Sequence, residues 1–219
     1  MKEITKYDIE TMDKVYRLNL VNSLSGIKPV NLVGTISKNN ITNLAVISSV
    51  VHLSSSPALL GFMQRPTTVP RHTYNNIHET GEYSINMVSS SFTDKAHYTS
   101  AKFHESQSEF DQCGLTEQFF KESKAPCVTE SPLKILLKFE EEYFIKSSGT
   151  LLMVGSIQSI YLPQNAVDPA GMIDLEDLQA IGVSGLNTYY NLTKMATYPY
   201  ARSGQFPQAD NFVKSIRTT

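Results

Sequence analysis

The stretch that decides the fold reads NLAVISSVVHLSSSPALLGFM and spans residues 43–63. Its apolar ends are rich in β-forming residues, and small hydroxyl residues crowd between them ahead of Pro57. Apolar runs of this length, bounded by polar turn residues, predict strands. The turn residues Lys38-Asn39-Asn40 precede this stretch, and their asparagines tolerate positive φ, so the first strand pair is predicted to be a hairpin.

Six strands are predicted along the chain, at residues 30–36, 44–51, 58–63, 83–88, 133–145 and 151–162. They do not alternate with long helices, so a parallel sheet built from βαβ units is not indicated. Strands of this number and spacing predict a mainly β protein, a closed or partly closed antiparallel barrel with short peripheral helices. No repeat, low-complexity segment or linker divides the chain, and we expect one domain over residues 1–219.

Short helices are expected around the barrel. Residues 5–16 form an amphipathic pattern, with Thr5 and Asp8 as a weak capping box, and we expect this helix to pack on the barrel. Thr73 is the predicted N-cap of a helix that ends at Gly81. The polar region that follows predicts two further short helices in an insertion that covers the barrel, one at residues 92–98 and one that opens at residues 109–110. The tail is expected to be an ordered extended segment.

Composition excludes several classes of function. The 219 residues include 19 basic and 21 acidic side chains, a net charge of −2, which disfavours a nucleic-acid partner. No apolar run resembles a signal peptide or a membrane span, so we expect a cytoplasmic protein without membrane contact. Cys113 and Cys127 are too sparse for a disulfide framework and are expected to be reduced and structural. The histidines have no metal-binding spacing, and no metal is expected.

The segment RHTYNNI, residues 71–77, carries the strongest sign of a ligand. An arginine at a helix start offers a cation beside free backbone N–H groups, which suits a phosphate. Asn43, Ser48 and Ser49 can add neutral donors, although on composition alone hydrogen bonding along a strand edge is the better explanation for them. No Walker A, GxGxxG or GxSxG pattern is present. The residues alone therefore indicate a phosphorylated ligand on a β-barrel.

An ordered set of short motifs makes the chain recognisable. From about residue 17 to residue 200 it resembles the flavin reductase-like family of FMN-binding split barrels. The matching pieces are Arg17-Leu18-Asn19-Leu20-Val21-Asn22, Lys28-Pro29, Val33-Gly34-Thr35, Asn43-Leu44-Ala45, Ser48-Ser49, Gly61-Phe62, Arg65-Pro66, Arg71-His72-Thr73, Asn76-Ile77, Gly81, Ile85-Asn86, Ala96-His97, Thr99-Ser100-Ala101, Glu130-Ser131-Pro132 and Gly149.

The resemblance implies a six-stranded antiparallel Greek-key split barrel, a homodimer, and one FMN per subunit near the dimer interface. The N-terminal helix and the C-terminal tail would be peripheral. Carried over residue by residue, the cofactor-binding set falls into four groups: Asn43, Leu44 and Ala45 along the ribityl chain and ring edge; Ser48, Ser49 and Val50 at the polar edge of the ring; Arg71, Thr73 and Asn76 at the phosphate; and Lys95 over the flavin or the donor pocket. His97 is the candidate catalytic residue, and a solvent-facing helix position is the alternative for it.

These resemblances imply a flavin reductase that transfers a hydride from NAD(P)H to FMN and passes the electrons to free flavin, to a monooxygenase or to another redox partner. In such enzymes the cofactor carries the redox chemistry, and the protein sets its orientation and access. Two alternatives remain open. One is an FMN-binding electron carrier that a protein partner reduces, and the other is a ligand-binding split barrel without redox function.

Overall fold

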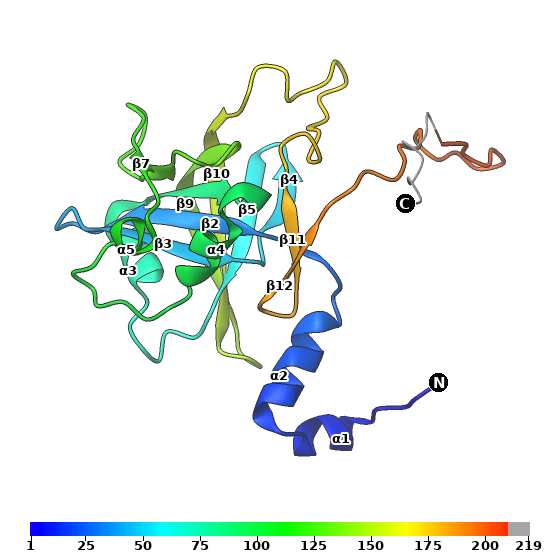
Figure 1. Ribbon diagram of the computed structural model, residues 1–219, viewed down its shortest axis with the longest axis horizontal. Coiled ribbons are helices and arrows are strands. Elements are labelled where there is room, and N and C mark those ends of the chain that lie inside the picture. Colours follow the sequence, from blue (N-terminus) through cyan, green and yellow to red (C-terminus); the bar gives the residue numbers. More distant parts are fainter. Residues whose placement is uncertain (210–219) are drawn as a thin grey trace.

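The computed structural model describes residues 1–209 and is mainly β, as predicted (Figure 1). Its main sheet has seven antiparallel strands in the order β3-β2-β6-β9-β10-β5-β4. In that order the strands are β3 (Thr42–Ile47), β2 (Asn31–Ile36), β6 (Glu82–Met87), β9 (Lys134–Ile145), β10 (Thr150–Tyr161), β5 (Ala58–Gln64) and β4 (Val51–Ser55). The predicted β2–β3 hairpin is confirmed, and Asn40 adopts a φ of 60° in its turn.

All six predicted strands are present in the main sheet, and β4 is the seventh strand of that sheet. The prediction of a single strand over residues 44–51 was wrong, because β3 ends at Ile47 and β4 starts a new pairing with β5 at Val51. Ser49 explains the break. Its Oγ accepts a hydrogen bond from the backbone N–H of Met63 at 3.1 Å and so replaces a ladder partner at that point.

The sheet ends at β3 and β4, which follow each other in the chain. The barrel is therefore split between these two strands, and residues 48–50 cross the opening. Apolar side chains pack on both faces of the sheet: Leu32 belongs to a core cluster with Leu44 and Phe110, whereas Val33 belongs to a second cluster with Phe62 and other residues. Consecutive residues of one strand thus serve two cores, as the pleat requires.

Helices cover the sheet close to β3. α3 (His72–Thr80) packs on β2 and β3, and the insertion after β6 contributes η1 (Ser90–Phe92), α4 (Thr93–Tyr98) and α5 (Glu109–Cys113). The small pair β7 (Glu117–Gln118) and β8 (Cys127–Val128) follows. As expected for reduced structural residues, both cysteines are free and buried.

The insertion satisfies the open edge of β3. The backbone N–H of Leu44 donates to Glu109 Oε2, and that of Val46 donates to Thr99 Oγ1, both at 3.0 Å. These side chains take the place of a neighbouring strand, so another strand cannot pair there.

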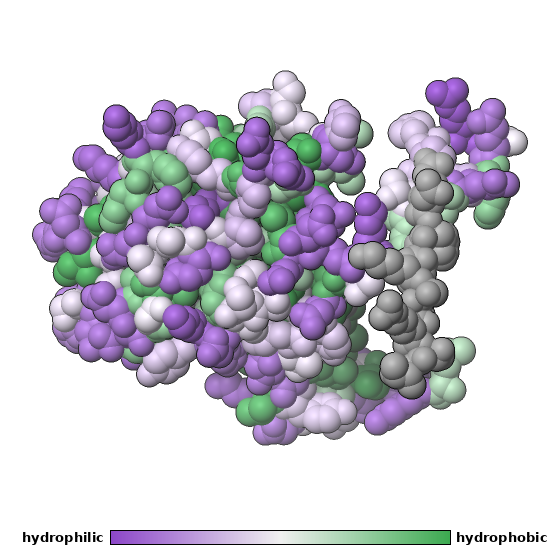
Figure 2. All heavy atoms as spheres, turned by 45° about the horizontal axis from the view of Figure 1, so that its top comes forward, coloured by the Kyte–Doolittle hydropathy of each residue, from purple (hydrophilic) through white to green (hydrophobic). Residues whose placement is uncertain are grey.

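The N-terminal segment differs from the prediction. Two helices, α1 (Lys6–Thr11) and α2 (Lys14–Ser23), replace the single helix expected at residues 5–16, because Asp13 caps a new helix with its side chain. The capping box of Thr5 and Asp8 is confirmed. Neither helix contains a buried residue, so the expected packing on the barrel was wrong. Figure 2 shows hydrophilic and hydrophobic residues intermixed on one face of the molecule.

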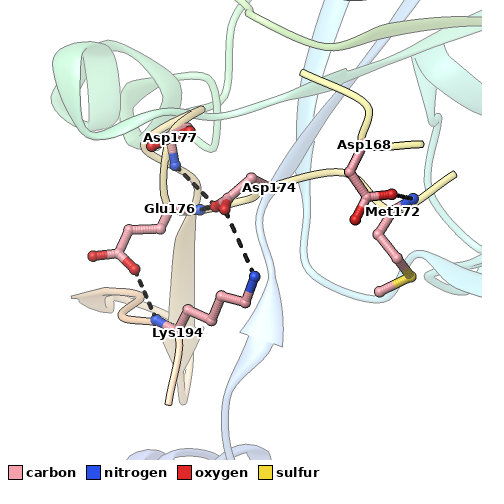
Figure 3. A network of polar contacts seen from close by, with 6 residues as sticks. All are labelled: Asp168, Met172, Asp174, Glu176, Asp177 and Lys194. Carbon is pink, nitrogen blue, oxygen red and sulfur yellow. Dashed lines mark hydrogen bonds and ion pairs between the residues drawn. The ribbon is translucent and has the colours of Figure 1, made fainter. Parts of the chain in front are cut away.

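A third sheet joins a segment that precedes the main sheet in the chain to two strands that follow it. β1 (Lys28–Pro29) pairs with β11 (Ile181–Ser184), which pairs with β12 (Thr188–Asn191). Beyond β12, Lys194 is held by its backbone N–H, which donates to Glu176 Oε2 at 3.0 Å, and by an ion pair with Asp174 at 3.9 Å (Figure 3). Across residues 1–209 no helix has the length and apolar character needed to cross a membrane.

Candidate functional site

The candidate site lies where α3 meets β3, and strand alternation divides the predicted residues there. Asn43 and Ala45 lie on the α3 side of β3. The side chain of Leu44 points to the opposite face, where it is fully buried in the core, and its N–H is already bonded to Glu109. Leu44 therefore presents neither its side chain nor its amide hydrogen to a ligand.

Two buried hydrogen bonds fix α3 against the sheet. Asn43 Nδ2 donates to Thr73 Oγ1 at 3.0 Å, and Asn76 Nδ2 donates to Thr35 Oγ1 at 3.1 Å. Thr35 and Asn43 are paired across β2 and β3. One point of the hairpin therefore holds both the first and the second turn of α3. The structure thus brings three predicted residues together, with their side chains engaged in positioning α3.

The start of α3 lies two residues earlier than predicted. Arg71, not Thr73, is the N-cap, and its side chain makes no capping hydrogen bond. An arginine has only donors, so it cannot accept from the N–H groups of the first turn. The predicted cap was wrong because the Thr73 hydroxyl is buried against Asn43. The end at Gly81, with a φ of 74°, is confirmed.

Arg71 is oriented by one backbone contact. Its Nε donates to the carbonyl oxygen of Pro66 at 3.2 Å, and within residues 1–209 its terminal nitrogens have no hydrogen bond or ion pair. A half-buried arginine is thus the N-cap of a helix whose start has no side-chain cap. This set of donors fits a phosphate, because helix N–H groups and arginine both bind anions.

A nearby hollow has the opposite character. It has a volume of about 250 Å³ and adjoins Asn43, His72 and Asn76. Glu79 and Glu105 line it, and no lysine or arginine is among its lining residues. A phosphate is disfavoured in such surroundings, so the Arg71 side of α3 is the better anion site.

The segment that crosses the split holds Ser48, Ser49 and Val50. Ser49 both accepts from the Met63 N–H and donates to the Met63 carbonyl oxygen, at 3.1 and 3.4 Å. Its hydroxyl is therefore used within the protein. Val50 packs on the core cluster that includes Phe62, and Ser48 lies half-buried in the bend.

Lys95 and His97 lie on α4, and each has a partner within the protein. Lys95 Nζ donates to the carbonyl oxygen of Gly114 at 2.6 Å, where α5 ends. His97 Nδ1 and the Tyr189 hydroxyl are hydrogen-bonded at 2.8 Å, with their rings edge to face. The structure does not bring the ammonium of Lys95 to Arg71.

Sequence reasoning missed Glu109, Thr99 and Tyr189. Glu109 is buried, and this burial raises the pKa of its carboxyl while the hydrogen bond from Leu44 opposes the rise. Ser108 accepts from the Phe110 N–H and marks the helix start, but no local pattern indicates that the next residue reaches β3. Tyr189 lies in the tail, where the sequence predicts only an ordered extended segment.

A known domain family and known structures are similar to this chain in sequence and architecture. The flavin reductase like domain matches residues 26–178, more than half of the chain. A Shewanella frigidimarina protein proposed to be a flavin reductase with a split barrel domain is 40% identical; the match covers 92% of this chain and 100% of that one, with a TM-score of 0.89.

Two more distant structures share the fold alone. Nitrilotriacetate monooxygenase component B from Bacillus cereus is 20% identical, with 89% of this chain and 97% of that chain covered and a TM-score of 0.79. Flavoredoxin of Desulfovibrio vulgaris is 22% identical, with 82% and 92% covered and a TM-score of 0.67. By its sequence and its split-barrel fold, the chain belongs to the flavin reductase like domain family.

Proposed function

We propose that this protein is an FMN-binding flavin reductase that oxidises NAD(P)H. The observation that carries the proposal is the uncapped start of α3 with Arg71 at the N-cap, on a barrel of the flavin reductase like family. A helix start without its own cap, beside an arginine, is a ready site for the phosphate of a mononucleotide.

The predicted residues would share the work of holding the cofactor. Arg71 and the first N–H groups of α3 would bind the phosphate, and the buried pairs of Asn43 with Thr73 and of Asn76 with Thr35 would hold that helix in place. Ala45 and the backbone of residues 48–50 would lie along the rest of the molecule. FMN, when bound, accepts a hydride from the reduced nicotinamide and passes its electrons on.

The residues of the protein have a modest chemical task in this proposal. They bind and orient the flavin and control the approach of the nicotinamide, and the hydride needs no side-chain base. His97, tied to Tyr189, is the proposed residue that orients the donor or the ring, and Lys95 is a weaker candidate since Gly114 engages it.

Anaerobic reduction tests the proposal. Protein loaded with FMN should lose its flavin absorbance near 450 nm when NADH or NADPH is added, and it should oxidise the nicotinamide with turnover when free flavin is supplied. If FMN binds and neither nicotinamide reduces it, the reductase proposal fails.

An electron carrier is the second candidate, because the fold is shared with a protein named flavoredoxin. In that case nicotinamide oxidation is slow and electron exchange with a redox protein is fast. The likeness to a monooxygenase component B makes a monooxygenase another candidate acceptor. A protein that cannot be reconstituted with FMN would instead support a barrel without redox function.

The proposal includes a cytoplasmic homodimer built from one domain over residues 1–219, with its core at about residues 17–200. Residues 210–219 lie outside the described part of the chain. The exposed strand β4, where Val51 and Leu53 face solvent, supports a partner, since unprotected edges invite pairing.

A further inference from the structure

One strand of the main sheet, β9, carries an irregularity. Its register against β10 shifts between Val154 and Gly155, and Glu140 is left without a partner residue in β10. An extra residue of this kind is a β-bulge, and it shifts the alternation of the side chains by one position. Phe139 and Glu142 therefore share one side of the strand, where regular alternation would separate them. Both are half-buried, and the two residues between them are exposed.

The bulge turns Glu142 towards α3. Its Oε1 accepts a hydrogen bond from the Tyr74 hydroxyl at 3.1 Å, and its Oε2 lies 3.0 Å from His78 Nε2. The His78 ring also contacts the rings of Tyr74 and Phe139, with centroids 4.4 and 5.0 Å apart. Tyr74 and His78 are four residues apart, so they lie on one side of the helix. One carboxylate thus holds two successive turns of α3.

This contact is sheltered from solvent. The side chains of His78 and Glu142 are 37% and 27% exposed, and Tyr74 and Phe139 pack against the core cluster that includes Phe62. Burial raises the pKa of the Tyr74 hydroxyl above its ordinary value of 10.0, and the negative charge of Glu142 adds to the rise. The hydroxyl therefore stays protonated and remains a donor to the carboxylate.

Tyr74 belongs to the part of α3 that is proposed to bind the phosphate. The first hydrogen bond of the helix runs from the Asn75 N–H to the Arg71 carbonyl oxygen at 2.9 Å. The three N–H groups before it, at residues 72–74, make no hydrogen bond in the described part of the chain. Such groups at a helix start are free to bind an anion. The residue whose hydroxyl Glu142 holds thus also offers one of the free N–H groups.

From these contacts we infer that Glu142 is a positioning residue for the flavin, which fixes the start of α3, through Tyr74 and His78, where the phosphate binds. The inference rests on the proposed FMN site and adds to it a residue from β9. Tyr74 and His78 lie on a different side of α3 from Thr73, which is bonded to Asn43. A helix held on two sides keeps the direction of its N–H groups, and binding groups need such support to stay in place.

A comparison of FMN with riboflavin tests this role, because the two flavins differ only in the phosphate. Glu142→Ala should weaken FMN binding about tenfold and leave riboflavin binding unchanged. Loss of a negative charge alone would favour the phosphate, so weaker FMN binding would report lost positioning. Glu142→Gln keeps an acceptor for the Tyr74 hydroxyl and should restore most of the FMN affinity. Glu141→Ala removes the same charge at the exposed neighbouring position and is the matched control, with wild-type affinity for both flavins.

Tyr74→Phe is a second variant, which keeps the ring packing and removes one hydrogen bond, and it should weaken FMN binding about threefold. Wild-type FMN affinity in Glu142→Ala, or an equal loss of FMN and riboflavin affinity, would overturn the inference. If Glu142→Ala does not fold, the same two measurements on Tyr74→Phe decide. Reduction of bound FMN by NADH or NADPH is measured separately on the wild-type protein. Its absence would remove the reductase proposal and leave the role of Glu142 in binding intact.

Discussion

Arg71 shows how one residue can leave a site open for a ligand. Most N-cap residues accept hydrogen bonds from the first turn, whereas an arginine cannot. We expect Arg71→Ala to weaken FMN binding ten- to a hundredfold, about 1.5–3 kcal/mol, because a charge-assisted contact is lost. Flavin titration measures this change. Arg202→Ala, an exposed arginine in the tail, is the control, and equal affinities of both variants would place the phosphate elsewhere.

Tyr83 is a second residue with an unusual position. Its hydroxyl is the single buried side-chain polar atom without a partner in the described chain, and a Cβ at Gly155 would lie 2.8 Å from its Cζ. Tyr83→Phe should raise the free energy of unfolding by about 1–3 kcal/mol, because an unsatisfied hydroxyl leaves the core. Gly155→Ala should lower it by about 1–3 kcal/mol through overpacking. In denaturant unfolding, Tyr83→Phe should relieve part of the Gly155→Ala loss, and strict additivity would contradict this contact.

Glu109 makes stability depend on pH in a predictable direction. Burial raises its pKa above the ordinary value of 4.5, so the folded state favours the protonated carboxyl. The corresponding stability is present below that value and is lost as the pH rises towards the folded pKa. Glu109→Gln keeps an acceptor for the Leu44 N–H and cannot ionise. The difference in unfolding free energy between variant and wild type should therefore grow in favour of the variant from pH 4 to pH 7, and a constant difference would contradict this.

At the scale of elements, local patterns predicted the strands because alternation and turn residues act over short distances. The end of α3 at Gly81 and the presence of the six predicted strands are confirmed. The start of α3 and the separate strand β4 could not be predicted, because each depends on a distant partner: Asn43 for Thr73, and Met63 for Ser49. The same limit applies to the site. Residue types at Arg71 pointed to a phosphate, whereas the engagement of Asn76, Ser49 and Lys95 within the protein is visible only in three dimensions.

The contact between α4 and β12 allows a sharper test of His97. His97→Ala should slow anaerobic reduction by NAD(P)H at least tenfold with little change in FMN affinity or melting temperature, if the ring orients donor or flavin. Tyr189→Phe is the matched variant, since it removes the hydrogen bond and keeps the ring packing. Wild-type kinetics in His97→Ala, or equal loss of stability in both variants, would reduce His97 to an anchor of the β11–β12 hairpin.

At the scale of the whole molecule, the two edges of the sheet are treated differently. Glu109 and Thr99 cover β3, whereas most residues of β4 are exposed. A fold that protects one edge with buried side chains and leaves the other edge open is consistent with assembly, because an exposed strand edge can pair with another chain.

Assembly of this kind predicts a melting temperature that depends on protein concentration. If unfolding is coupled to dissociation, a hundredfold increase in concentration adds about 2.8 kcal/mol per dimer, or about 1.4 kcal/mol per chain. For a chain of this size that corresponds to a rise of about 3–6 °C. Calorimetry at two concentrations measures it, with FMN held at the same saturation because a bound ligand also stabilises the folded state. A wild-type protein that melts at one temperature at both concentrations would show that the folded chain needs no second copy.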